Sequence, residues 1–288
     1  MPRQKRKRFL PIFITPCCKK RNEAPEKDAR RPIRSSPEEI WFVKFRVLFA
    51  TLLSCSPALA EPVRVAVAAN FALPAKVIAA NFAQETGESA ELSFGATGKL
   101  YAQIRNGAPF AVLLAADAET PAKLEQQGDA VNGSRFTYAV GRLVLWSPKP
   151  DAVDPQGEVL KKGHDTHLAI ADPKLAPYGA AAVETLKALS LLPTMQPRFV
   201  QGENIAQAYQ FVASGNAGLG FVALSQVMRE GRIMTGSAWI VPDHFHQPIR
   251  QDAVILRKGE GSAAARAWMD YLKGDKAKRV MRSFGYGF

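Results

Sequence analysis

Apolar and polar residues alternate in short blocks from residue 63 onward, and the blocks show two different periods. Runs of small and β-branched residues, typical of buried strands, are followed by stretches in which apolar positions recur at helical spacing. In the first part of the chain the expected strands are 63–69, 90–94 and 110–115, and the expected helices are 73–85, 99–105 and 120–127. This alternation predicts an α/β fold, with a mainly parallel sheet flanked by helices.

The pattern changes near Tyr138, where a long β run over 140–146 stands at a position suited to cross into a second lobe. The alternation then resumes, with expected strands 167–171, 198–200 and 219–223, helices 178–189 and 204–213, β runs 239–241 and 252–256, and closing helices 263–272 and 277–283. We therefore expect two α/β lobes with a ligand cleft between them. Lobe 1 comprises residues 61–140 with 241–288 returning to it, and lobe 2 comprises residues 141–240.

The first 60 residues differ from the rest in charge and cysteine content. They carry a net charge of +9 out of +12 for the whole chain, and they hold all three cysteines, Cys17, Cys18 and Cys55. A short apolar stretch, 47–53, precedes Ala58-Leu59-Ala60, which has the small-residue pattern of a signal-peptide cleavage site. We expect residues 1–60 to be a basic leader and secretory signal peptide, and the mature protein to start at Glu61.

Two alternatives remain open for this leader. Residues 52–55 also read as a lipoprotein box, in which Cys55 would be lipidated and would hold the protein on a membrane. Residues 1–40 are long and polar for the start of a signal peptide. Either the true start lies downstream, or these residues form a disordered tail.

The chain after residue 60 shows none of the common signatures of enzymes or nucleic-acid-binding proteins. Its net charge is +3, and no run of Lys and Arg has interleaved aromatic residues, so we expect no nucleic acid as a partner. Residues 98–99 resemble part of a P-loop, but Ser93 and Leu100 stand where that motif needs Gly and Ser or Thr. His244 and His246 have no apparent third metal ligand. No nucleophile elbow occurs, so we expect a binding protein rather than an enzyme.

Four loops follow strands and open helices, and they begin at Asn70, Thr97, Tyr178 and Asn204-Ile205. In open α/β sheets ligands bind beyond the carboxyl ends of the strands. A helix start has backbone N–H groups without internal partners and a partial positive charge, so converging starts would hold an oxyanion without a charged side chain. Two alternatives stay open. Asn and Thr are also favoured helix N-caps, and Asp172 and Glu203 would repel an anion unless they point away.

Six motifs between residue 63 and about residue 286 together resemble the periplasmic molybdate-binding proteins of ABC transporters. They are 68–70, 93–100, 107–109, 171–179, 219–222 and 271–274. The resemblance implies a two-lobed type II periplasmic-binding-protein fold, with ligand positions at Asn70, Thr97, Tyr178 and Ile205, the last through its backbone N–H. A Tyr that other members use falls on Ala223, and we expect the hydroxyl of Tyr178 to substitute for it.

The resemblance also implies a function and a location. We expect a monomeric periplasmic protein that binds molybdate or tungstate, needs no cofactor, and delivers the anion to an inner-membrane permease. The alternatives are a binding protein for another oxyanion such as sulfate, or for an organic anion, and an enzyme or ligand sensor on the same scaffold, because fold does not fix function.

Overall fold

The computed structural model describes residues 61–162 and 166–288. The expected signal peptide, its cleavage site after Ala60 and the alternative lipid attachment at Cys55 lie outside the described residues. Within the described part, no helix is both long enough and apolar enough to cross a membrane.

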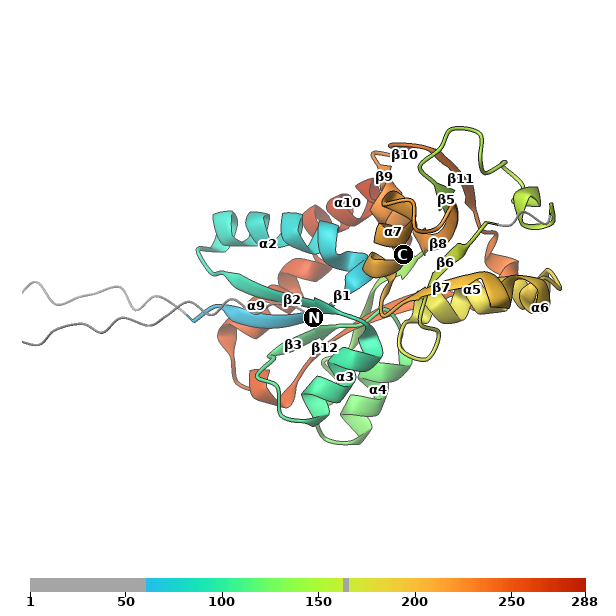
Figure 1. The fold of residues 1–288 in the computed structure, drawn as a ribbon. Coiled ribbons are helices and arrows are strands. Elements are labelled where there is room, and N and C mark those ends of the chain that lie inside the picture. The colour runs from blue at the N-terminus through green and yellow to red at the C-terminus, as the bar shows by residue number, and fades with distance from the viewer. Residues whose placement is uncertain (1–60, 163–165) are drawn as a thin grey trace, which may run out of the picture. The chain divides into compact units, whose positions relative to one another are not determined.

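Two five-stranded sheets organise residues 61–288 (Figure 1). The first has the strand order β2 (Ala90–Gly95), β1 (Val63–Ala68), β3 (Val112–Leu114), β12 (Ile249–Ile255) and β4 (Phe136–Gly141). The strands β2, β1 and β3 pair in parallel, whereas β12 runs antiparallel to both of its neighbours. The first sheet and its helices are called lobe 1 below.

The second sheet has the order β11 (Ser237–Ile240), β5 (Leu143–Ser147), β8 (Leu219–Ala223), β6 (Leu168–Ala171) and β7 (Phe199–Gly202). Its strands β8, β6 and β7 are parallel, and β5 and β11 are antiparallel to their neighbours. This sheet and its helices are called lobe 2. A two-stranded ribbon, β9 (Met228–Arg229) with β10 (Arg232–Ile233), follows the short helix α8 (Leu224–Val227).

Helices cover both faces of the first sheet, and the apolar side chains of β1 after Arg64 are buried on both faces. Val65 and Val67 of β1 belong to one core, which they share with α2 (Ala72–Thr86), α9 (Ala263–Lys273) and α10 (Asp275–Ser283). Ala66, between them, points to the opposite face and packs with α3 (Thr97–Arg105) and α4 (Glu119–Gln126). A strand that is buried on both faces therefore reads as a continuous apolar run.

A third core lies in lobe 2 and is built on the same principle. It contains β5, β6 and β8 together with buried residues of α5 (Pro177–Ala188) and α7 (Ile205–Ala213). The short helix α6 (Leu192–Met195) follows α5, and its Met195 is buried in this core.

The structure corrects one expectation about the strands. The single β run expected over 140–146 is two strands, β4 and β5, which separate at Arg142 and belong to different sheets. Gly141 pairs with Ile249 of lobe 1, whereas Leu143 pairs with Ala223 of lobe 2. Both halves are apolar because both are buried, so hydropathy does not reveal the break at Arg142 between the two strands.

Candidate functional site

Residues from both lobes line one small pocket, and all four residues predicted from the sequence take part in it. Asn70 and Thr97 come from lobe 1, and Tyr178 and Ile205 come from lobe 2. The pocket is small and partly open, and none of its lining residues has a charged side chain. Four helical segments begin around this pocket, as expected for the carboxyl edges of parallel strands.

The side chains of Asn70 and Thr97 do not cap their helices. Asn70 lies within a 3-10 turn, Ala69–Phe71, that leads into α2, and Thr97 is the first residue of α3, after the N-cap Ala96. The hydroxyl oxygen of Thr97 accepts a hydrogen bond from the backbone N–H of Ala116 at 3.0 Å. Its hydroxyl hydrogen remains available for a further acceptor, so the alternative of a simple N-cap does not apply to either residue.

Lobe 2 contributes two helix starts. Pro177 is the first residue of α5 and Tyr178 the second, and Pro at this position needs no hydrogen-bond acceptor. In α7 the Asn204 side chain caps the backbone N–H groups of Ala206 and Gln207 at 3.0 and 3.1 Å. That cap does not use the N–H of Ile205, which is the first residue of the helix and lines the pocket.

The amide group of Asn70 makes its hydrogen bonds inside the protein. Its Nδ2 donates to Oε1 of Gln251 at 2.9 Å and to the hydroxyl of Tyr286 at 3.0 Å. Both amide hydrogens therefore have acceptors. The donors left on this segment are the backbone N–H groups at its start.

A buried hydrogen-bond network connects the two lobes beside the pocket. From lobe 2, the Ser225 hydroxyl donates to the carbonyl of Asn70 at 2.8 Å, and the Tyr178 hydroxyl accepts from Nε2 of Gln251 at 3.1 Å. Burial raises the pKa of Tyr286 to about 12 and holds the pKa values of Tyr138 and Tyr178 well above 10. These phenols are therefore neutral donors at physiological pH.

The two carboxylates that could repel an anion are held away from the pocket. Glu203 pairs with Lys99 of α3, with 2.6 Å between Oε2 and Nζ, and this ion pair also joins the lobes. Asp172 uses its Oδ1 to accept the backbone N–H of Lys174 at 2.9 Å. Neither carboxylate lines the pocket, so the structure does not place a negative charge against an anion bound there.

Several residues of this site escaped sequence reasoning. Gln251, Ser225 and Tyr286 have no local pattern that distinguishes them, and they become important only because the fold gathers them. Ala223 is buried at the end of β8 and does not line the pocket.

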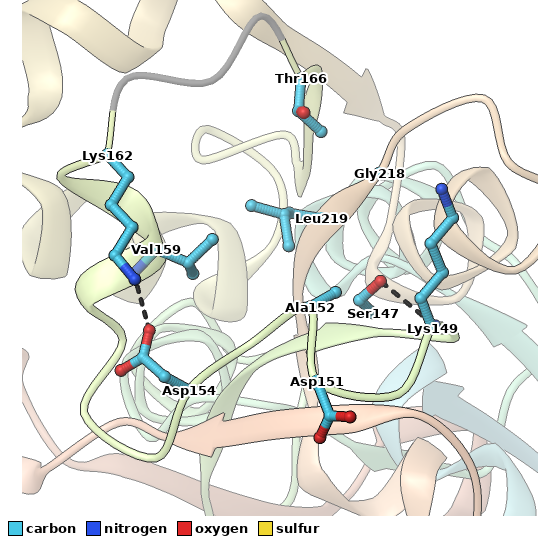
Figure 2. A pocket seen from close by; sticks show the side chains of 10 residues that line it. All are labelled: Ser147, Lys149, Asp151, Ala152, Asp154, Val159, Lys162, Thr166, Gly218 and Leu219. Atoms are coloured by element: carbon cyan, nitrogen blue, oxygen red, sulfur yellow. Dashed lines mark hydrogen bonds between the residues drawn. The ribbon is translucent and has the colours of Figure 1, made fainter.

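Two larger hollows lie outside this pocket. One adjoins it and includes Gly98, Ala116 and Asp117, a carboxyl whose pKa burial raises. The other lies in lobe 2 at the amino ends of β6 and β8, the edge opposite α5 and α7 (Figure 2). There Asp154 accepts backbone N–H groups of its own loop, including that of Val159 at 2.8 Å, so its carboxylate stabilises the loop.

Comparison with known proteins identifies similar chains. Residues 63–287 match the profile of a family described as bacterial extracellular solute-binding protein. The chain is 59% identical over 240 residues to the molybdate-binding protein ModA of Azotobacter vinelandii, covering 83% of this chain and 95% of that protein. It is 52% identical over 231 residues to ModA of Rhodobacter capsulatus, covering 80% and 90%.

A solved structure agrees with these matches. The periplasmic molybdate-binding protein of Azotobacter vinelandii superposes with a TM-score of 0.76 at 44% identity, covering 78% of this chain and 99% of that one.

Proposed function

The chain belongs to the family of bacterial extracellular solute-binding proteins, and on that premise we propose that it is the substrate-binding component of a molybdate importer. It captures the MoO4 dianion, or tungstate, between its lobes and delivers it to the permease of an ABC transporter. One observation carries the proposal: helix starts from both lobes converge on a pocket that no charged side chain lines.

The physical reason lies in the way such a pocket replaces water around an anion. The helix starts bring partial positive charge and unpaired N–H donors, and neutral donors hold a dianion without a counter-ion. In this proposal Thr97 and Tyr178 donate through their hydroxyls, and Asn70 and Ile205 through their backbone N–H groups. Nothing is chemically transformed, and no cofactor takes part.

Selectivity follows from the same donor set. Phosphate retains a proton at neutral pH, and a pocket of donors offers that proton no acceptor, so phosphate binds with one unpaired hydrogen. Sulfate carries no proton and is excluded by its smaller size. Tungstate has nearly the size of molybdate and binds comparably.

The remaining parts of the proposal concern the cell. The leader carries the protein to the periplasm, where a monomer closes its lobes around the anion by a hinge motion that the permease recognises. A binding protein for sulfate remains the second candidate, because the loop 95–97 of this chain contains only one hydroxyl.

The test is the melting temperature of the purified protein with molybdate, tungstate, sulfate or phosphate, since a ligand that binds only the folded state must stabilise it. We expect shifts with molybdate and tungstate alone. A shift with sulfate instead would change the substrate, and no shift with any of the four would overturn the proposal.

Site variants sharpen this test. Removal of one donor beside a buried charge costs about 1–3 kcal/mol, so Thr97→Ala is expected to raise the Kd for molybdate roughly 5- to 150-fold. Thr86→Ala is the matched control, because the Thr86 hydroxyl donates to the Phe82 carbonyl at the far end of α2. Unchanged affinity in Thr97→Ala would show that the lobe 1 part of the site is wrongly assigned.

A further inference from the structure

Gln251 is a fully buried amide that contacts ligand residues proposed on both lobes. It lies on β12 with no exposed surface. Its Oε1 accepts from Nδ2 of Asn70 in lobe 1 at 2.9 Å, and its Nε2 donates to the hydroxyl of Tyr178 in lobe 2 at 3.1 Å. Gln251 does not line the pocket itself, so any influence on a ligand passes through these neighbours.

The hydrogen bonds around Gln251 assign a role to each end of its amide. Its carbonyl oxygen has two lone pairs and faces two donors, Asn70 and the hydroxyl of Tyr138, the latter also at 2.9 Å. The Tyr138 hydroxyl also lies 3.0 Å from the carbonyl oxygen of Ala115, and Nε2 of Gln251 points at Tyr178. Since the Tyr178 oxygen accepts a hydrogen from Gln251, its own hydrogen is directed elsewhere, either to the neighbouring Tyr286 or into the pocket.

Gly141 makes room for this contact where the chain leaves lobe 1. A Cβ at this position would collide with the Tyr178 hydroxyl and with Nε2 of Gln251, and would lie 2.9 Å from Cζ of Tyr178. Such a distance is too short for any real carbon contact, so only glycine leaves the phenol its place. Gly141 and Gln251 of lobe 1 thus form a site, called the seat below, that receives the Tyr178 hydroxyl of lobe 2.

We propose that Gln251 is a positioning residue: when the lobes close, it holds the Tyr178 oxygen through Nε2 and turns the Tyr178 hydrogen toward the bound oxyanion. Without the anion that hydrogen turns to Tyr286. The inference rests on the proposed function, because it assigns a hydrogen-bond direction within the same site. It predicts that the direction of the Gln251–Tyr178 bond, and not only its presence, sets the affinity.

Gln251→Glu changes this direction while keeping the shape of the side chain. One carboxylate oxygen still accepts from Asn70 and Tyr138, but the other replaces the Nε2 donor with an acceptor. Tyr178 then donates to Glu and loses its hydrogen bond to the anion. When the carboxyl is protonated it donates again, so the variant regains the wild-type arrangement at low pH. Burial raises the pKa of such a carboxyl into an accessible range.

The measurement is the Kd for tungstate between about pH 5 and pH 8, by calorimetry on the full chain, with the ligand-free fold checked by circular dichroism. Hydrogen bonds to charged groups are strong, so we expect Gln251→Glu to bind tungstate about 10- to 100-fold more weakly than wild type near pH 8. Near pH 5 its Kd should approach the wild-type value. The titratable groups facing the site are Tyr138, Tyr178 and Tyr286, with Asp117 and Asp252 acting on Tyr138. All are shared with the wild type, so the ratio of the two Kd values at each pH isolates residue 251.

Repulsion between the new carboxylate and the anion would also make the affinity depend on pH. The Tyr178→Phe background separates this repulsion from the loss of the hydrogen bond that Tyr178 donates to the anion. If Gln251 acts through the Tyr178 hydroxyl, Gln251→Glu adds little pH dependence in the Tyr178→Phe background. A pH-dependent loss that persists there would overturn the inference.

Gly141→Ala provides a second and independent test of the seat. It is expected to weaken tungstate binding in the wild type, and to cost less in the Tyr178→Phe background, where the collision with the hydroxyl oxygen is absent and those with Nε2 of Gln251 and Cζ remain. Equal losses in both backgrounds would overturn the inference, as would Gln251→Glu with wild-type affinity at every pH. If the wild type itself binds no tungstate, the proposed function fails first and this inference falls with it.

Discussion

The ion pair between Lys99 and Glu203 is expected to act on ligand affinity asymmetrically, depending on which partner is removed. It joins α3 of lobe 1 to the loop before α7 of lobe 2, two residues before the backbone N–H of Ile205. Lys99→Met breaks the pair and also leaves an unpaired carboxylate two residues before Ile205. Glu203→Gln breaks the same pair but removes that negative charge.

The size of the effect follows from the exposure of the two side chains, 50% for Lys99 and 42% for Glu203. Solvent screening limits ion pairs this exposed to about 0.2–1 kcal/mol, despite the 2.6 Å separation. A contact made only when the lobes are closed adds that free energy to binding, which corresponds to about 1.4- to 5-fold in Kd. Lys99→Met should lie at or above the upper end of this range, and Glu203→Gln should stay close to wild type.

The assay is calorimetric titration with molybdate of wild type, both single variants and the double variant, at low and high salt. The Debye length falls from roughly 30 Å at about 0.01 M to roughly 3 Å at about 1 M, so the loss in Lys99→Met should shrink as salt is added. Lys161→Met is the matched control, because Lys161 pairs with Glu158 at 2.7 Å, is similarly exposed, and lies entirely within lobe 2.

Two results would refute this reasoning. One is a loss of binding in Glu203→Gln as large as in Lys99→Met, which would mean that the carboxylate does not repel the anion. Alternatively, Lys161→Met could cause the same loss, which would mean that the effect is unrelated to the contact between the lobes.

Three further predictions concern stability. Burial raises the pKa of Tyr286 from 10.0 to about 12, so the neutral phenol favours the folded state by roughly 3 kcal/mol relative to the ionised phenol. This part of the free energy of unfolding is complete below pH 10 and is lost as pH rises toward 12. Ultraviolet titration should show this phenol ionising only as the fold is lost. Arg135→Met leaves the buried Asp252 carboxylate without the guanidinium 2.7 Å away and should lower the free energy of unfolding in urea by about 3 kcal/mol, whereas Arg135→Lys should cost less. Gly179→Ala drives a Cβ into the backbone at the end of β6 and should lower Tm by several degrees relative to Gly287→Ala, where the nearest atom is 3.8 Å away.

The parts of the fold that depend on short-range periodicity could be predicted from the sequence. The strand β1 and the helix α2 follow from a buried β-branched run and from apolar positions at helical spacing. The four candidate ligand residues could be found for the same reason, because each lies where a predicted strand ends and a predicted helix begins. The rule that ligands bind at carboxyl edges then brings them together.

The rest depends on contacts between distant positions, about which local patterns carry no information. Asn70 and Gln251 are 181 positions apart, and Asn70 and Tyr286 are 216 apart. The sequence around Asn70 therefore does not reveal that the fold supplies acceptors for both of its amide hydrogens. The break at Arg142, within the β run that crosses between the lobes, has no local signal for a related reason, since burial in one sheet or in two gives the same hydropathy.

The position of β12 has a consequence for the order in which the protein can fold. This strand is the last described strand along the chain, yet it lies between β3 and β4 in the interior of its sheet. Until it emerges, β4 has no neighbour and the sheet of lobe 1 ends at β3. Lobe 1 therefore cannot be completed until nearly all of the chain has been synthesised. Since Gln251 belongs to this strand, a chain that stops before it lacks both the lobe and the seat for Tyr178.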